Sequence, residues 1–257
     1  MLTVISPAKT LDYETPSSIK KHTQPLFADR SAELIDVLTK YSPKQIGQLM
    51  SISDKLAELN VNRYADWNRK ATKKNARQSL LAFKGDVYVG MEANTFSESD
   101  FEFAQNHLRI LSGLYGALRP LDLMQPYRLE MGTKLKNEQG ANLYDFWGTS
   151  ITKHLNKQHK ANKDKVLLNL ASNEYFKSVQ IDLLDGDVIA PVFKDKKNGK
   201  YKIITFFAKK ARGSMSGWVI RKKITDPKKL KQFKGMGYRF SPDESTETKP
   251  VFLRDQS

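Results

Sequence analysis

Two serines and a lysine form the first pattern with recognisable chemistry in this sequence. Ser51 and Ser53 enclose one apolar residue, and Lys55 follows two positions later. Residues 42–60 begin with Ser-Pro, a typical helix start, so the pattern predicts two short helices joined by a tight turn. Such a turn exposes backbone N–H groups that bind a nucleic-acid phosphate irrespective of base sequence, and Lys55 adds a positive charge. This arrangement is typical of a helix-hairpin-helix.

An ordinary packed pair of helices is the alternative interpretation of residues 42–60. The helix-hairpin-helix prefers glycine at both serine positions, and serine adopts a positive φ less readily than glycine. Asp54 also places a carboxylate where a phosphate would approach. The apolar side chains that could hold the two helices together without any ligand are Ile46, Leu49, Ile52 and Leu56.

Positive charge gathers in one stretch of the chain, residues 194–239. The 257 residues include 43 Lys and Arg against 28 Asp and Glu, a formal net charge of +15. Residues 194–239 contain 16 of the basic residues and only two acidic ones, so the rest of the chain is close to neutral. A field this local attracts nucleic acid, anionic lipid surfaces or phosphorylated ligands. A lysine-rich face that serves only solubility is the alternative.

Three further cations of interest lie inside this basic segment, just before Gly213. We expect a strand to end near Phe207 and a loop to follow it as far as residue 214. Cations beside a glycine at a strand end suit a phosphate backbone or a small anionic ligand. Together with the turn described above, they give the predicted contacts with a nucleic-acid backbone: Ser51, Ser53, Lys55, Lys209, Lys210 and Arg212.

Three apolar strands are predicted to end in small and polar residues. They cover residues 2–5, 108–111 and 166–170. In open α/β sheets a ligand binds in the crevice beyond the carboxyl ends of the strands. Ordinary strand-to-helix turns would show the same spacing. The prediction is a cleft with five candidate residues: Lys9, Arg119, Arg128, Asn173 and Lys177.

Several kinds of site are excluded by what the sequence lacks. It has no cysteine, which rules out thiolate catalysis, zinc fingers, iron–sulfur clusters and disulfides. Its four histidines lack metal-ligand spacing, and neither common glycine-rich phosphate loop is present. Ser6 and Lys9 have the spacing of a serine–lysine nucleophile, but the partner motifs are missing. The sequence therefore predicts no cofactor and no catalytic residue, and a hard-cation site made only of carboxylates stays open.

The chain shows none of the common signals for a membrane. No apolar run approaches the roughly 18 residues needed to cross a bilayer, and the apolar stretch within residues 1–9 is too short for a signal peptide. We expect a cytoplasmic protein with no membrane partner, and a monomer.

The remaining patterns predict one mixed α/β (α+β) domain over residues 1–257. They come from the spacing of apolar residues, from helix caps and from an Asn-Gly turn, which is the strongest short signal for a hairpin. The predicted elements are a helix over residues 31–41, a helix capped by Ser97 and Asp100, a helix over residues 143–155, a β-hairpin over residues 187–208, and a helical turn begun by Asp226 and Pro227.

Seven long motifs carry a family resemblance. They are residues 6–13 (SPAKTLDY), 52–57 (ISDKLA), 83–88 (FKGDVY), the long block 111–132, 169–172 (NLAS), 174–178 (EYFKS) and 207–213 (FAKKARG). Through these motifs nearly the whole chain resembles the bacterial YaaA family of peroxide stress proteins.

The resemblance implies a single mixed α/β domain of unusual architecture, with a positively charged cleft and a helix-hairpin-helix-like element. It also implies duplex DNA binding and a role in lowering free intracellular iron, so that peroxide does less damage to DNA. An enzyme that acts on a small anionic or nucleotide-like substrate in the cleft is the alternative function.

Overall fold

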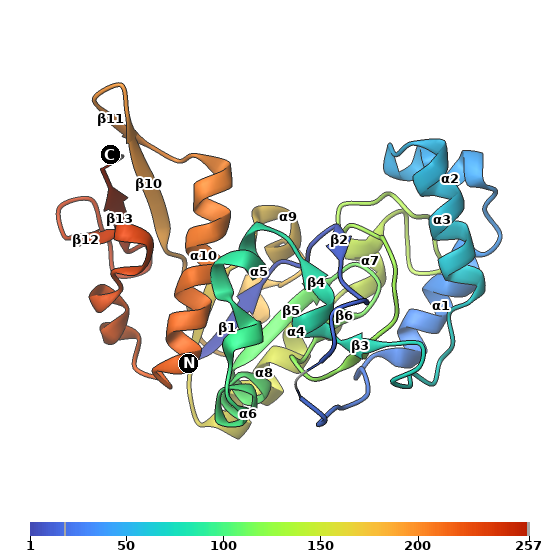
Figure 1. Ribbon diagram of the computed structural model, residues 1–257, viewed down its shortest axis with the longest axis horizontal. Helices are drawn as coiled ribbons and strands as arrows, with labels where there is room; N and C mark the ends of the chain where they lie inside the picture. The colour runs from blue at the N-terminus through green and yellow to red at the C-terminus, as the bar shows by residue number, and fades with distance from the viewer. Residues whose placement is uncertain (18, 256–257) are drawn as a thin grey trace.

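A five-stranded sheet forms the centre of the protein (Figure 1). The computed structural model describes residues 1–17 and 19–255. The strand order is β6-β5-β1-β8-β9; β1, β5, β8 and β9 run parallel, and β6 runs antiparallel at one edge. The strands are β1 (Leu2–Ile5), β5 (Leu108–Ser112), β6 (Gly116–Leu118), β8 (Val166–Leu170) and β9 (Asp187–Ile189).

The position of β1 brings distant parts of the chain together. Ile5 pairs with Ile110 of β5 on one side and with Leu170 of β8 on the other. Every residue of β1 and β5 is buried, as expected for parallel strands that are covered on both faces. The three predicted strands are confirmed, and their carboxyl ends meet at one edge of the sheet.

Helices α6 (Glu98–His107), α8 (Ser150–Asn162) and α10 (Thr205–Arg221) pack on this sheet. The predicted capping box of α6 is confirmed, because the Ser97 hydroxyl accepts from the Asp100 amide and the Asp100 carboxylate accepts from the Ser97 amide. The single helix predicted over residues 143–155 is wrong. Gly148 has a φ of +46° and divides the segment into α7 (Leu143–Trp147) and α8.

A second sheet lies at one end of the molecule (Figure 1). Its order is β11-β10-β13-β12, and Asn198 and Gly199 form the predicted hairpin turn with φ values of +54° and +75°. The predicted hairpin over residues 187–208 is too long, because β9 belongs to the central sheet and the second arm ends at Lys202. The strands are β10 (Val192–Lys197), β11 (Lys200–Lys202), β12 (Arg239–Ser241) and β13 (Val251–Arg254).

The loop predicted for residues 207–214 is wrong, because these residues lie inside α10. Gly213 is present for close packing and not for a turn. A Cβ atom on Gly213 would lie 1.8 Å from the carbonyl oxygen of Val87 in α5 (Asp86–Met91). Gly217 and Gly90 make two similar backbone approaches between the same helices, with Cβ distances of 2.6 and 2.2 Å. The three glycines hold α10 directly against α5.

The predicted helical pair over residues 42–60 is present as α2 (Pro43–Met50) and α3 (Asp54–Ala65). Ser42 begins α2 through a capping box with Gln45, and Pro43 occupies the first helical position. The helix predicted over residues 31–41 is α1 (Ala28–Leu38), shifted by three residues. Figure 1 shows α1, α2 and α3 together at the end of the molecule opposite the second sheet.

The helices and the two larger sheets confirm the predicted mixed α/β fold class. Short elements connect them. One hydrophobic cluster includes buried residues from Met1 to Phe252. Within the described residues, the structure contains no helix of the length and hydrophobicity that a membrane span requires. The short elements are β2 (Thr10–Leu11) paired with β4 (Phe83–Lys84), β3 (Arg77–Gln78) paired with β7 (Leu123–Met124), α4 (Ser79–Ala82), α9 (Asn173–Phe176), and 3-10 helices over Ala93–Thr95, Ile181–Leu183, Pro227–Gln232 and Gly235–Gly237.

Candidate functional site

Two serines join the carboxyl ends of β1 and β8. The Ser172 amide donates to the Ser6 hydroxyl oxygen at 2.9 Å, and the Ser6 hydroxyl donates to Ser172 Oγ at 3.3 Å. The Tyr88 hydroxyl, which comes from α5, donates to the Ser6 carbonyl oxygen at 3.1 Å. These bonds fix the loop after β1 against α5 and against the loop after β8.

A cavity of about 510 Å³ lies directly beyond these strand ends. Its walls come from the loop after β1, from the junction of β4 and α5, from Glu130, from the start of α9 and from α10. The polar side chains that line it include Lys9, Lys84, Asp86, Glu174, Lys209 and Arg212. A cavity with both cations and carboxylates in its walls thus lies beyond the predicted strand ends. Of the five candidate cleft residues, Lys9 is part of its lining, and Arg119, Arg128, Asn173 and Lys177 are not.

Glu130 brings two of the five candidate cleft residues together. Its Oε1 atom lies 3.2 Å from Lys9 Nζ and 3.1 Å from Arg128 Nη2. The Lys9 side chain is 67% exposed, whereas the Arg128 and Glu130 side chains are mostly buried. The carboxylate therefore neutralises part of the positive charge at this side of the cavity.

Arg212 enters the same cavity from α10, one helical turn from Lys209. Its side chain is half-buried and has no hydrogen bond or ion pair with another described residue. Burial alone lowers the pKa of Arg212, without an opposing contribution from any acid. Lys210, between them, has its ammonium 4.5 Å from the centre of the Phe206 ring and does not line the cavity. The cavity thus contains a cation that has no partner within the described part of the chain.

A comparison with known protein families identifies the family of the chain. The sequence profile of the family described as "Peroxide stress protein YaaA" matches residues 1–244. The chain belongs to the YaaA family. All residues that line the 510 Å³ cavity fall within the matched part. This YaaA-family chain is therefore a peroxide stress protein.

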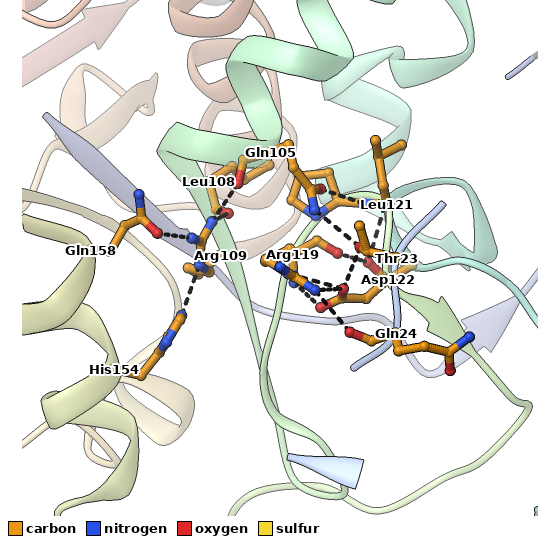
Figure 2. A network of polar contacts seen from close by, with 12 residues as sticks. Thr23, Gln24, Gln105, Leu108, Arg109, Arg119, Leu121, Asp122, His154 and Gln158 are labelled. Atoms are coloured by element: carbon orange, nitrogen blue, oxygen red, sulfur yellow. Dashed lines mark hydrogen bonds and ion pairs between the residues drawn. The ribbon is translucent and has the colours of Figure 1, made fainter. Parts of the chain in front are cut away.

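The structure places Arg119 away from the cavity. β6 runs antiparallel to β5, and Leu118 pairs with Ile110, so the chain leaves β6 at the opposite edge of the sheet. Figure 2 shows that Arg119 binds the buried Asp122 there, with Nε and Nη2 at 3.0 and 2.8 Å from Oδ1. Burial raises the pKa of Asp122, although Arg119 acts in the opposite direction. Arg119 is part of a structural ion pair.

Two other candidates, Asn173 and Lys177, also lie outside the cavity. Both are exposed on α9, whereas Ser172, Glu174 and Tyr175 line the cavity. The Lys177 ammonium lies 5.0 Å from the centre of the Tyr144 ring. The end of β8 was predicted correctly. The residues that face the cavity from α9 were not, because the prediction named Asn173 and Lys177.

Sequence reasoning missed Tyr88, Glu130 and Glu174. All three are members of motifs that carry the family resemblance, and this was the available signal. Tyr88 looks like an ordinary core residue, and its ring is buried. Its hydroxyl bond to Ser6 depends on the docking of α5 on the sheet, which no local pattern encodes.

The turn between α2 and α3 presents free polar groups to solvent. Ser51 adopts the left-handed conformation, with φ of +52° and ψ of +54°, and its amide donates to the Gly47 carbonyl oxygen. Ser53 is the N-cap residue of α3, but its side chain makes no capping bond. Ser51, Ser53, Asp54 and Lys55 are all exposed. The turn between the two helices is therefore tight and exposed to solvent.

We expect Ser51→Gly to stabilise the protein. The Cβ atom of serine makes the left-handed conformation unfavourable, whereas glycine adopts it without strain. The unfolding free energy should therefore rise by about 1 kcal/mol. Urea unfolding would measure it. Ser51→Ala keeps the Cβ atom and is the matched control, and an equal gain in both variants would contradict this explanation.

A larger cavity of about 620 Å³ lies near β3 and the end of α3. It contains Arg77, whose guanidinium binds Asp12 at 3.2 Å, and Arg63, which donates to Asn60 at 3.4 Å. Its principal arginines therefore have partners within the protein. The described residues contain no group of three or more His, Asp or Glu side chains placed to hold a metal ion.

Proposed function

We propose that this peroxide stress protein binds double-stranded DNA through the phosphate backbone, with little preference for base sequence. The supporting observation is the charge of residues 194–239. Five of their 16 cations form ion pairs: Lys194, Lys196, Arg221, Lys223 and Arg239. The other eleven have no ion-pair partner among residues 1–17 and 19–255. A surface that keeps this many free cations attracts a polyanion.

Five of the eleven free cations lie on two neighbouring elements. Lys197, Lys200 and Lys202 are exposed on the β10–β11 hairpin. Lys209 and Lys210 follow within the first two turns of α10. Lysine ammonium groups contact phosphate oxygens and carry no information about base sequence. The proposal assigns these five lysines to the DNA backbone.

The turn between α2 and α3 is the second proposed contact. The uncapped start of α3 leaves its first amide groups free for a phosphate, and Lys55 lies in the first turn. Asp54 weakens this contact through its negative charge. We therefore assign the larger share of the DNA affinity to the lysines near α10.

We propose a protective role for this DNA binding in the cell. DNA binding in the cytoplasm, together with a lowering of free iron, would protect DNA from peroxide; the iron part is supported by family membership alone. In cells without this protein, we expect more free iron and more DNA strand breaks after peroxide. Restoring the wild-type chain should reverse both.

Removal of Lys209 and Lys210 should weaken DNA binding roughly tenfold at low salt. Two lost phosphate contacts should also reduce the slope of log affinity against log salt by about two, because each contact contributes about 0.9. Fluorescence anisotropy with a duplex at several salt concentrations would measure both quantities for Lys209→Ala/Lys210→Ala. Lys55→Ala should reduce the slope by about one.

Lys153→Ala/Lys157→Ala is the matched control, because it removes two exposed lysines from α8, outside the basic segment. An equal loss in this control would show that only the net charge matters. Unaltered affinity and slope in Lys209→Ala/Lys210→Ala would reject the proposed surface. A preference of more than about a hundredfold for one of several unrelated duplexes would contradict backbone recognition.

A further inference from the structure

The guanidinium of Arg212 has no assigned partner in the proposed DNA contact. The Arg212 side chain is half-buried and lines the 510 Å³ cavity, where the guanidinium makes no hydrogen bond or ion pair with another described residue. A buried charge in a folded protein is normally paired or bound to a ligand, because its removal from water is costly. The unpaired guanidinium therefore points to an anion that comes from outside the chain.

The acids that line the cavity are not available to Arg212. Glu130 is shared by Lys9 and Arg128 at 3.2 and 3.1 Å. Glu174 Oε1 accepts from the Gly132 amide at 3.0 Å. Neither these carboxylates nor Asp86 lies within ion-pair distance of Arg212. The cavity thus has a cationic wall on α10 and separate carboxylates that belong to other segments.

The position of the cationic wall is fixed before any ligand binds. Gly213 follows Arg212 directly and packs against the Val87 carbonyl oxygen of α5. Gly90 of α5 approaches the Lys210 carbonyl oxygen in the same way. These backbone contacts leave α10 little freedom to move. A guanidinium held by such a scaffold binds an anion with a small loss of conformational entropy.

We propose that this cavity binds a small phosphomonoester of about the size of a nucleoside monophosphate, with Arg212 and Lys209 on its phosphate. Two cations one helical turn apart match a phosphate dianion, and arginine binds phosphate through two parallel N–H groups. Glu130 and Glu174 accept hydrogen bonds from hydroxyl or amino groups of the rest of the ligand. The volume is within the range of small-molecule sites.

A terminal phosphate fits this site better than the phosphate of a duplex. A phosphodiester carries one negative charge and is linked to sugars on both sides, whereas a monoester has three free oxygens and close to two charges. The site lies at the carboxyl ends of parallel strands, where ligands of α/β proteins bind. The inference shares Lys209 with the proposed DNA contact but rests on Arg212, which that contact does not use.

The test uses the whole chain and a defined panel of probes. These are the four ribonucleoside 5′-monophosphates, ribose 5-phosphate, inorganic phosphate, and the corresponding nucleosides and ribose. Titration calorimetry and the shift in thermal midpoint should detect at least one phosphomonoester, while its dephosphorylated counterpart should not bind. Arg212→Gln should weaken this binding at least tenfold, and Arg212→Lys should lie between Arg212→Gln and the wild type.

Lys222→Gln is the matched control, because Lys222 is an exposed cation at the end of α10, outside the cavity. It should bind the probe like the wild type. Arg212→Gln should fold with an unliganded thermal midpoint no lower than that of the wild type, because no internal partner of Arg212 is lost. The proposal fails if no phosphomonoester binds, if Lys222→Gln and Arg212→Gln weaken binding equally, or if Arg212→Gln lowers the unliganded midpoint. Duplex binding measured in parallel reports on the DNA proposal separately.

Discussion

Gly213→Ala is expected to lower the unfolding free energy by more than about 3 kcal/mol, or to prevent folding. The new Cβ atom would lie 1.8 Å from the carbonyl oxygen of Val87 and 2.7 Å from its carbonyl carbon. Both atoms are backbone atoms, so no side-chain rotation can relieve the overlap. Helix α10 would have to move away from α5, and Arg212 and Lys209 would move with it. Urea unfolding followed by far-UV circular dichroism measures the loss.

Gly47→Ala is the matched control, since Gly47 is also a helical glycine, in α2. The nearest atoms to its new Cβ atom are 3.5 Å away, an ordinary contact. This substitution should stabilise the protein by about 0.5–1 kcal/mol, because alanine favours a helix more than glycine does. The two substitutions should therefore have opposite signs. A Gly213→Ala variant as stable as the wild type would refute the close packing of α5 and α10.

Acid should destabilise the protein through His154, beginning at pH values where most carboxylates are still charged. Figure 2 shows His154 beside Arg109, a buried arginine whose Nε donates to His154 Nε2 at 3.0 Å. Burial, reinforced by the charge of Arg109, lowers the pKa of His154 to about 3. Burial also lowers the pKa of Arg109 to about 10, so this guanidinium keeps its charge at neutral pH. His154 therefore acts as the neutral acceptor.

The direction of the effect follows from proton binding. The unfolded chain protonates His154 near pH 6.5, and the folded protein does so only near pH 3, so falling pH favours the unfolded state between these values. The loss should approach about 1.4 kcal/mol per pH unit, or about 2.5 kcal/mol by pH 4.5. Urea unfolding at pH 7.5, 6.5, 5.5 and 4.5 measures it. His154→Gln retains an acceptor oxygen and should show a shallower dependence; equal slopes in both proteins would exclude His154 as the cause.

The parts of the fold that sequence predicted well are those with local signals. The apolar strands at residues 2–5 and 166–170, the Ser97 cap and the Asn-Gly turn each depend on a few neighbouring residues. The meeting of strand ends follows from a general rule for parallel sheets, and it led to the correct edge. Lys9 lines the cavity there, and Arg128 binds the same carboxylate, Glu130, without lining the cavity.

The parts that the sequence could not predict depend on the direction of a strand within the sheet and on the packing of helices against each other. Arg119 was assigned to the cleft because nothing near it shows that β6 runs antiparallel to β5. Gly213 looks like a loop residue because glycine commonly marks turns, and its contact with Val87 is distant in sequence. The shared role of Glu130 also depends on two segments, residues 6–10 and 126–132, that meet only in the folded protein.

The central position of β1 has a consequence for the synthesis of the chain. Residues 2–5 are translated long before their partners, residues 108–110 and 167–170. At 5–20 residues per second, the ribosome needs roughly 8–30 s to reach the second partner. Until β5 is made, Leu2, Val4 and Ile5 have no strand beside them, and the sheet cannot close before β8 follows. We therefore expect this nascent segment to be open to chaperones, and slower translation between β1 and β8 should favour aggregation over folding.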